Sequence, residues 1–237
     1  MAALALAACL LAGCTTRSIS NAGYDENSRR YGAHTGNYHG ELSELEIVGV
    51  SADAHPSEAD IRSALATRAA PILERRSRAL LIQSGAAFPA DAMLSGLGQR
   101  LHVQAFSGQP STLTANGPSY SVSLRLAAAR GGYDKIICYW SVLESEQIDQ
   151  ATKLISWVPL AGSLLPDQQQ AMRLRLKAAI VDVASGSWTF VAPPSVASTA
   201  LNSRLTRRNT DQTLVRELKT LGYENLISAL TADLSGK

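Results

Sequence analysis

Cysteines and aromatic residues are scarce in this sequence, and neither sign of charge is in large excess. Among 237 residues there are 3 cysteines and 5% aromatic residues, while 22 Lys and Arg stand against 20 Asp and Glu. The net charge of +2 lacks the basic excess with which proteins bind nucleic acids, so no nucleic-acid partner is predicted. So few cysteines exclude a disulfide scaffold, which a chain of this length does not need in order to build a core.

A hydrophobic run long enough to span a membrane is also missing. From Ala2 to Ala12 the sequence has no polar side chain, but a transmembrane helix needs about 20 such residues. A short apolar segment that ends in small residues is instead typical of a secretory signal peptide. The alternative is an amino-terminal strand with a core cysteine, although alanine-rich runs are poor strands.

The end of this apolar segment, LAGC at positions 11–14, resembles the bacterial lipobox. The resemblance implies that residues 1–13 are a lipoprotein signal peptide and that Cys14 is acylated on its thiol and on its new amino group. A second acyl chain turns marginal membrane binding into stable anchoring, at about 0.8 kcal/mol for each buried CH₂. Because the first basic residue is Arg17, we expect the signal peptide to begin before Met1.

The residue after the lipobox cysteine indicates which membrane carries the anchor. In Gram-negative lipoproteins the absence of Asp at this position implies sorting to the outer membrane, and here the residue is Thr15. We therefore expect a protein on the periplasmic face of the outer membrane, with membrane lipid as its partner through acylated Cys14. Cys9 leaves with the signal peptide, so Cys138 has no disulfide partner. An unpaired cysteine in an apolar strand is a small hydrophobic residue.

After the signal peptide we expect a tether and one domain. Residues 14–40 contain Gly, Asn, Ser and Arg without apolar periodicity, which predicts a flexible tether from the membrane to the domain. Residues 41–237 have the length of a single domain. The prediction is therefore one periplasmic α/β domain behind a lipid anchor.

Hydrophobic periodicity predicts the elements of this domain. The predicted strands cover residues 44–51, 78–85, 100–106, 134–144, 172–183 and 188–193. The predicted helical stretches begin at Ser57, near Pro89 and at Pro118, and two more end the chain. Helices that alternate with strands, followed by carboxyl-terminal helices, predict an α/β (α+β) fold in which helices pack on a mixed sheet.

The spacing of apolar residues also predicts which helix faces are buried. In the helix capped by Ser57 one face carries Ile61, Ala64, Leu65 and Ala69. In the helix after Pro118 the residues at helical spacing are Val122, Leu126 and Ala129. Leucine recurs every three or four residues at the carboxyl end. These leucines are Leu214, Leu218, Leu221, Leu226, Leu230 and Leu234.

The carboxyl half, residues 118–234, resembles the family of the curli secretion lipoprotein and the amino-terminal domain of TolB. The matching order is a helix, Gly-Gly, a strand and an Asp-Val-x-x-Gly hairpin, here Asp182, Val183 and Gly186 followed by Trp188. In such a hairpin Asp182 can accept hydrogen bonds from turn amides and Gly186 can supply a positive φ. The resemblance implies this fold and an envelope compartment, with a ring-forming secretion component as one alternative function.

The segment between the two long strands is the least expected part of the chain. Residues 154–165 carry no charge, and Trp157, Pro159 and Gly162 argue against one regular helix. Burial of each large apolar side chain would contribute about 1.5 to 3 kcal/mol, so the segment must cover an apolar surface. That surface is the domain's own core, a protein partner or second copy of this chain, or the membrane. The candidate partner-binding residues are Leu154, Ile155, Trp157, Val158, Leu160, Leu164 and Leu165.

Basic residues alternate with apolar ones in the longest predicted strand. Arg173, Arg175 and Lys177 share one face, where they could attract acidic lipid head groups or a polyanionic glycan. The alternative is cross-strand pairing with Glu144 and Glu146. We expect the second arrangement, a solvated face of paired charges.

Recognised catalytic and metal-binding motifs are missing. His34, His39, His55 and His102 have no ligand spacing, and the sequence has neither a Gly-x-Ser-x-Gly elbow nor a phosphate-binding loop. We therefore predict no catalytic residue, metal site or cofactor, and a protein that acts by binding, as an accessory factor in envelope assembly or secretion. A peptidase or hydrolase is the alternative, which an acidic neighbour of His102 in a cleft would favour.

Overall fold

The structure is a computed structural model, and it leaves two of the predicted sites undescribed. It describes residues 15–19, 41–50, 57–66, 73–108, 119–148, 168–202 and 207–235. The predicted lipidation site, Cys14, lies outside these ranges. The candidate partner-binding residues between 154 and 165 lie outside them as well.

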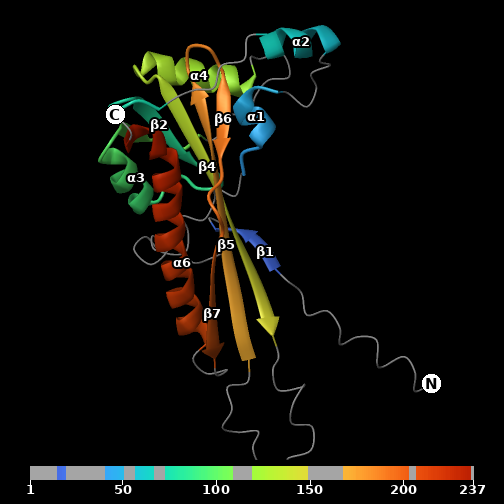
Figure 1. Cartoon of the computed structure of the whole chain (residues 1–237), viewed down its shortest axis with the longest axis vertical. Helices are drawn as coiled ribbons and strands as arrows, with labels where there is room; N and C mark the ends of the chain where they lie inside the picture. The colour runs from blue at the N-terminus through green and yellow to red at the C-terminus, as the bar shows by residue number, and fades with distance from the viewer. Residues whose placement is uncertain are drawn as a thin grey trace, which may run out of the picture.

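A long antiparallel strand pair forms the centre of the sheet. β4 (Lys135–Ile148) runs beside β5 (Gln168–Asp182), in register from Lys135 opposite Asp182 to Ile148 opposite Gln169. In Figure 1 these strands are the yellow and orange arrows along the long axis of the molecule. We call the two ends of this pair the Lys135 end and the Ile148 end.

Shorter strands extend both halves of the pair. At the Lys135 end, β2 (Arg78–Gln83) lies parallel to β4, β3 (His102–Ala105) lies parallel to β2, and β6 (Trp188–Val191) pairs with β5. Towards the Ile148 end, β1 (Thr15–Ser18) pairs with β4 and β7 (Val196–Asn202) pairs with β5. The described strands form one mixed sheet of seven strands.

Helices cover both faces of this sheet. α3 (Asp91–Gly98) and α6 (Arg207–Leu230) contribute to the core on one face, and α1 (Glu44–Val48) and α4 (Tyr120–Arg130) contribute to the core on the other. α2 (Glu58–Ala66) buries no residue. The predicted α/β fold, a mixed sheet with helices packed on it and a helical carboxyl end, is confirmed.

The side chains of β5 show how the sheet divides core from solvent. Met172, Leu174 and Leu176 are buried in the core beneath α6, while Arg173 and Arg175 between them are exposed. Successive side chains of a strand point to opposite faces, so the alternation in the sequence translates directly into this arrangement. The strand prediction for this segment is confirmed.

The strand predicted at 44–51 is wrong, because this stretch begins with helix α1. The backbone N–H of Ser43 donates to Glu46 Oε2 at 3.2 Å, as in a capping box. Gly49 ends the helix with φ of +85°, a left-handed conformation that favours glycine. Ile47 is the one buried residue of this helix. A single buried position is compatible with either a short helix or a strand, and the capping contacts identify the helix.

The helix faces predicted for α2 and α4 are also wrong. In α4 the buried side chains include Leu124 and Ala128, whereas Val122 and Leu126 are about half exposed. The two sets have the same helical spacing, and sequence spacing alone does not say which of them meets the sheet. In α2, Leu65 of the predicted apolar face is 66% exposed.

The two helical segments predicted at the carboxyl end are one continuous helix, α6, followed by a short 3-10 helix at Ala232–Ser235. Gly222 lies within α6, where a Cβ would come 2.5 Å from Leu176 Cδ1 and 2.9 Å from Leu174 Cδ2. Glycine therefore lets α6 approach β5 closely. Leu221 is exposed, while the other leucines of the series predicted at the carboxyl end are buried.

The first residues of the predicted tether belong to the sheet. Thr15 lies opposite Ser145 and Ser18 lies opposite Val142 in the antiparallel pairing of β1 with β4. Ile19, the next residue, is 2% exposed and belongs to the core beneath α6. The predicted tether over 14–40 is therefore wrong for β1 and Ile19.

No helix within the described ranges combines the length and the apolar character that crossing a bilayer requires.

Candidate functional site

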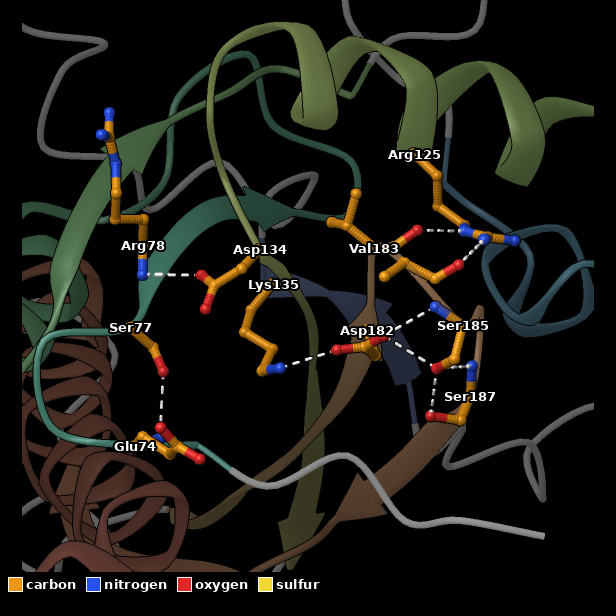
Figure 2. A network of polar contacts seen from close by, with 11 residues as sticks. Glu74, Ser77, Arg78, Arg125, Asp134, Lys135, Asp182, Val183, Ser185 and Ser187 are labelled. Carbon is orange, nitrogen blue, oxygen red and sulfur yellow. Dashed lines mark hydrogen bonds and ion pairs between the residues drawn. The ribbon is translucent and has the colours of Figure 1, made fainter. Parts of the chain in front are cut away.

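A network of polar contacts lies at the Lys135 end of the sheet (Figure 2). Lys135 Nζ lies 2.7 Å from Asp182 Oδ2, which joins the first residue of β4 to the last residue of β5. The other oxygen of Asp182 accepts hydrogen bonds from the backbone N–H and the hydroxyl of Ser185, at 2.7 and 2.8 Å. One carboxylate thus holds both the strand pair and the turn after it.

The charge of Asp182 is stabilised by these contacts. Partial burial acts to raise the pKa of the Asp182 carboxyl, but hydrogen bonds from Lys135 and Ser185 outweigh burial and lower the pKa from 3.8 to about 2. The carboxylate is therefore ionised at neutral pH. With its lone pairs directed at Lys135 and Ser185, it acts as a structural anion rather than as an acid or a base.

The same turn is held from α4. Arg125 donates from Nε to the carbonyl oxygen of Val183 and from Nη2 to that of Ala184, both at 2.9 Å. Gly186 has φ of +73°. The roles predicted for Asp182 and Gly186 in this hairpin are therefore confirmed, whereas the guanidinium of Arg125 was not anticipated.

The basic face of β5 pairs largely as expected. Arg173 Nε and Arg175 Nε lie 2.6 and 3.2 Å from the two carboxylate oxygens of Glu144 on β4. Lys177 pairs instead with Glu44 of α1, and the side chain of Glu146 lies outside the described part. These exposed ion pairs contribute about 0 to 1 kcal/mol each, so the face is a solvated one in which two guanidinium groups share one carboxylate.

His102 lines an open cavity of about 460 Å³ at the edge of the sheet, together with Arg78, Gln104 and Tyr133. The guanidinium of Arg78 lies over the ring of Tyr133, 5.4 Å from its centroid. The lining of this cavity includes no Asp or Glu. The acidic neighbour of His102 that would favour a hydrolase is therefore not found among these residues.

Cys138 lies in β4 and is fully buried. Burial raises the pKa of its thiol far above the ordinary value, because the thiolate would lose its hydration. The interpretation of Cys138 as a small hydrophobic residue agrees with this position. Within the described ranges, no cluster of three or more His, Cys, Asp and Glu side chains could hold a metal ion.

Comparison with known families identifies the relatives of this chain. The sequence model described as YafT bacterial lipoprotein matches residues 43–233. The chain belongs to the YafT bacterial lipoprotein family. The YafT match begins at Ser43, which precedes α1, and ends within the 3-10 helix after α6, so it covers most of the described fold. No curated protein sequence matches the chain.

Membership of the YafT family supports the lipoprotein interpretation of the LAGC motif at 11–14. The family match is to YafT lipoproteins, and it does not show the resemblance of the hairpin to the curli and TolB family. The motif itself and β1 both lie before the first matched residue, Ser43.

Sequence reasoning missed the attachment of the amino terminus to the sheet. Thr15, Thr16 and Ile19 are β-branched and therefore favour a strand, which was the available signal. Because Arg17 and Ser18 are polar and the run is short, the signal is lost in a segment without periodicity. The partner strand β4 begins at Lys135, and such a distant pairing leaves no local trace.

Proposed function

We propose that this YafT-family protein is lipidated at Cys14, stands on the periplasmic face of the outer membrane, and acts by binding an envelope protein. In this role it is an accessory factor in envelope assembly or secretion. The observation that carries the proposal is the LAGC motif at 11–14 in a chain of a bacterial lipoprotein family. The resemblance of the Asp182 hairpin to the curli and TolB family supports an envelope role in the same direction.

Lipidation is tested by following an acyl label in cells. Cys14→Ala is expected to lose the label and to leave the membrane fraction, because the thiol that carries the diacylglycerol is gone. Cys9→Ala, a matched change within the predicted signal peptide, is expected to keep both. A Cys14→Ala protein that still carries acyl label contradicts the proposal.

The proposed contact surface for the partner is the apolar 154–165 segment, which is part of the connection between Ile148 of β4 and Gln168 of β5. A photo-crosslinking residue in place of Leu160 is expected to form one defined adduct with an envelope protein in intact cells. The same residue in place of the exposed Ala127 on α4 is the control and is expected to form none. Equal adducts at both positions, or none at Leu160, contradict a binding role for this segment.

A further inference from the structure

The pairing of β1 fixes where the predicted lipid anchor enters the fold. Thr15 lies opposite Ser145, and β4 ends three residues later at Ile148. β1 and β4 are antiparallel and Ser18 lies opposite Val142, so Thr15, the first residue of β1, is the residue of that strand nearest to the Ile148 end. Cys14 directly precedes Thr15 in the sequence, so the lipidated residue is one peptide unit, about 3.8 Å between Cα atoms, from a residue that is held in the sheet.

Other element ends meet at this same end of the molecule. β5 begins at Gln168, which lies opposite Asn202, the last residue of β7, and α6 begins soon afterwards at Arg207. Figure 1 shows these ends together, at the opposite end of the long strand pair from α1, α4 and β6. Lys135 is ten residues from Ser145 along β4, which at about 3.3 Å per residue separates the two levels by about 33 Å.

We propose that the Ile148 end of the sheet faces the lipid surface, so that the sheet stands on the membrane and the Lys135 end points away from it. This inference rests on the proposed lipidation of Cys14. The acyl chains must enter the bilayer, and no residue lies between Cys14 and β1 that could act as a flexible spacer. The anchored protein therefore has a fixed orientation rather than a freely turning domain on a tether.

The burial of Ile19 supports this fixed orientation. Its side chain is 2% exposed and packs in the core beneath α6, in the same cluster as Leu143 and Met172. A strand that is followed by a core residue is held by packing as well as by its backbone hydrogen bonds. The amino terminus is therefore attached to the body of the fold at the level of Leu143, near the Ile148 end.

Positive charge is in excess among the described side chains at this level of the sheet. Thr16 lies opposite Glu144, which in turn lies opposite Arg173. Glu144 is shared by Arg173 and Arg175, whose side chains are 46% and 55% exposed. Two guanidinium groups beside one carboxylate leave an excess positive charge, which attracts anionic head groups near a membrane surface.

Two exposed alanines provide a matched pair of probe positions. Ala197 of β7 lies opposite Arg173, and Ala184 lies in the turn after Asp182. The two levels are nine residues apart along β5, or about 30 Å. Cys138 is fully buried and Cys14 is acylated under this proposal, so a cysteine introduced at either alanine is the accessible thiol.

The orientation is tested with the full lipidated chain carrying a fluorophore on Ala197→Cys or on Ala184→Cys. The protein is bound to vesicles of phosphatidylethanolamine and phosphatidylglycerol that contain a lipid with a nitroxide on its head group. Quenching at position 197 is expected to exceed quenching at position 184 several-fold. Equal quenching, or stronger quenching at 184, overturns the proposed orientation.

A pair of insertions separates a fixed strand from a flexible tether. One variant carries about 20 flexible residues, with an r.m.s. span of roughly 25 Å, between Cys14 and Thr15. This insert begins with Thr so that the residue after the lipidated cysteine is unchanged. The other variant carries the same insert between Asn27 and Ser28.

The first insertion is expected to reduce quenching at position 197 several-fold, and the second is expected to leave it unchanged. Equal reduction by both insertions means that residues 14–40 act as one tether, and it overturns the proposal. Flotation of the vesicles reports anchoring separately from orientation. Failure of the wild-type chain to float overturns both proposals, whereas flotation with the wrong quenching pattern overturns only the orientation.

Discussion

Asp182 shows how much one side chain can hold together at the end of a sheet. Its carboxylate contacts Lys135 of β4 and two groups of Ser185, while the carbonyl oxygens of the next two residues accept from Arg125 of α4. The side chain is 20% exposed, so these interactions are only partly screened by water. Because the contacts favour the ionised form, the pKa of Asp182 falls to about 2.

The pH dependence of stability follows from this lowered pKa. The folded-state pKa of about 2 lies below the ordinary value of 3.8, so the contribution of Asp182 is present above about pH 4 and is lost as the pH falls towards 2. Asp182→Asn is expected to lower the free energy of unfolding by about 1 to 2 kcal/mol at pH 7. The difference in unfolding free energy between wild type and Asp182→Asn is expected to shrink as the pH falls from about 4 towards 2.

Urea denaturation of the chain starting at Thr15, at several pH values between 7 and 2, measures this difference. Glu44→Gln is the control, because the pair of Glu44 with Lys177 is exposed and its loss changes stability by less than about 1 kcal/mol. A gap between wild type and Asp182→Asn that stays constant with pH would show that the lost contacts do not depend on the charge of Asp182.

The hairpin residues also show what local sequence can and cannot predict. Asp182 and Gly186 act within one turn, so their roles follow from the Asp-Val-x-x-Gly spacing alone. Lys135 is 47 residues away from Asp182, and only the register of β4 against β5 brings the two together. A pattern of side chains within a turn predicts the turn, but it does not predict its distant partners.

At the scale of elements, the attachment of β1 to the sheet depends on the burial of Ile19, the residue that follows the strand. Ile19→Ala removes most of a side chain that is 2% exposed, and truncation of a buried isoleucine typically lowers stability by about 2 to 5 kcal/mol. The amides of β1 are expected to lose protection from hydrogen exchange as well, because the strand is held by this contact.

Ile61→Ala on α2 is the matched control for Ile19→Ala. Ile61 is 49% exposed, so its truncation is expected to change stability by less than about 0.5 kcal/mol. Urea denaturation and hydrogen exchange followed by mass spectrometry measure both variants. Similar effects of the two truncations would contradict the assignment of Ile19 to the core.

The packing of α6 on β5 makes a second prediction at this scale. Gly222→Ala adds a Cβ 2.5 Å from Leu176 Cδ1, and relief of this overlap is expected to destabilise the fold by about 1 to 3 kcal/mol. Because the better helix propensity of alanine contributes a gain of about 1 kcal/mol, the net loss is expected to lie between about 0 and 2 kcal/mol. Thermal unfolding measures the change.

Gly98→Ala at the end of α3 separates packing from helix propensity. A Cβ at Gly98 would meet nothing within 4 Å, so this change is expected to be neutral or to stabilise by up to about 1 kcal/mol. If Gly222→Ala also stabilises the protein, α6 has room to move away from β5, and the close approach is not required.

At the scale of the whole molecule, the alternation along β5 was enough to predict the sheet, and apolar spacing was enough to predict that α4 exists. The same spacing could not choose between the Val122 and Leu124 faces of α4, because both are apolar and the choice depends on what the sheet offers. A strand was predicted in place of α1, because five residues are too few to distinguish the helical period of apolar residues from the strand period. The fold class is therefore more predictable than the surfaces that the fold leaves free.

The long strand pair has a further consequence for how the molecule unfolds. β4 and β5 run through both halves of the sheet, so neither half can unfold without losing strands that the other half needs. We therefore expect one cooperative transition in urea, as for a single domain. Trp140 reports the Lys135 half, because it is 8% exposed and its Nε1 donates to the carbonyl oxygen of Leu42 at 2.7 Å.

A fluorophore on Ala197→Cys reports the other half of the sheet. To isolate Trp140, both probes are followed in a chain in which Trp157 and Trp188 are replaced by Phe. The two transitions are expected to share one midpoint and one slope. Two separate midpoints would mean that β1 and β7 unfold independently of β2, β3 and β6. The half of the sheet at the Ile148 end could then open while the rest stays folded, and residues 41–237 would not be one domain.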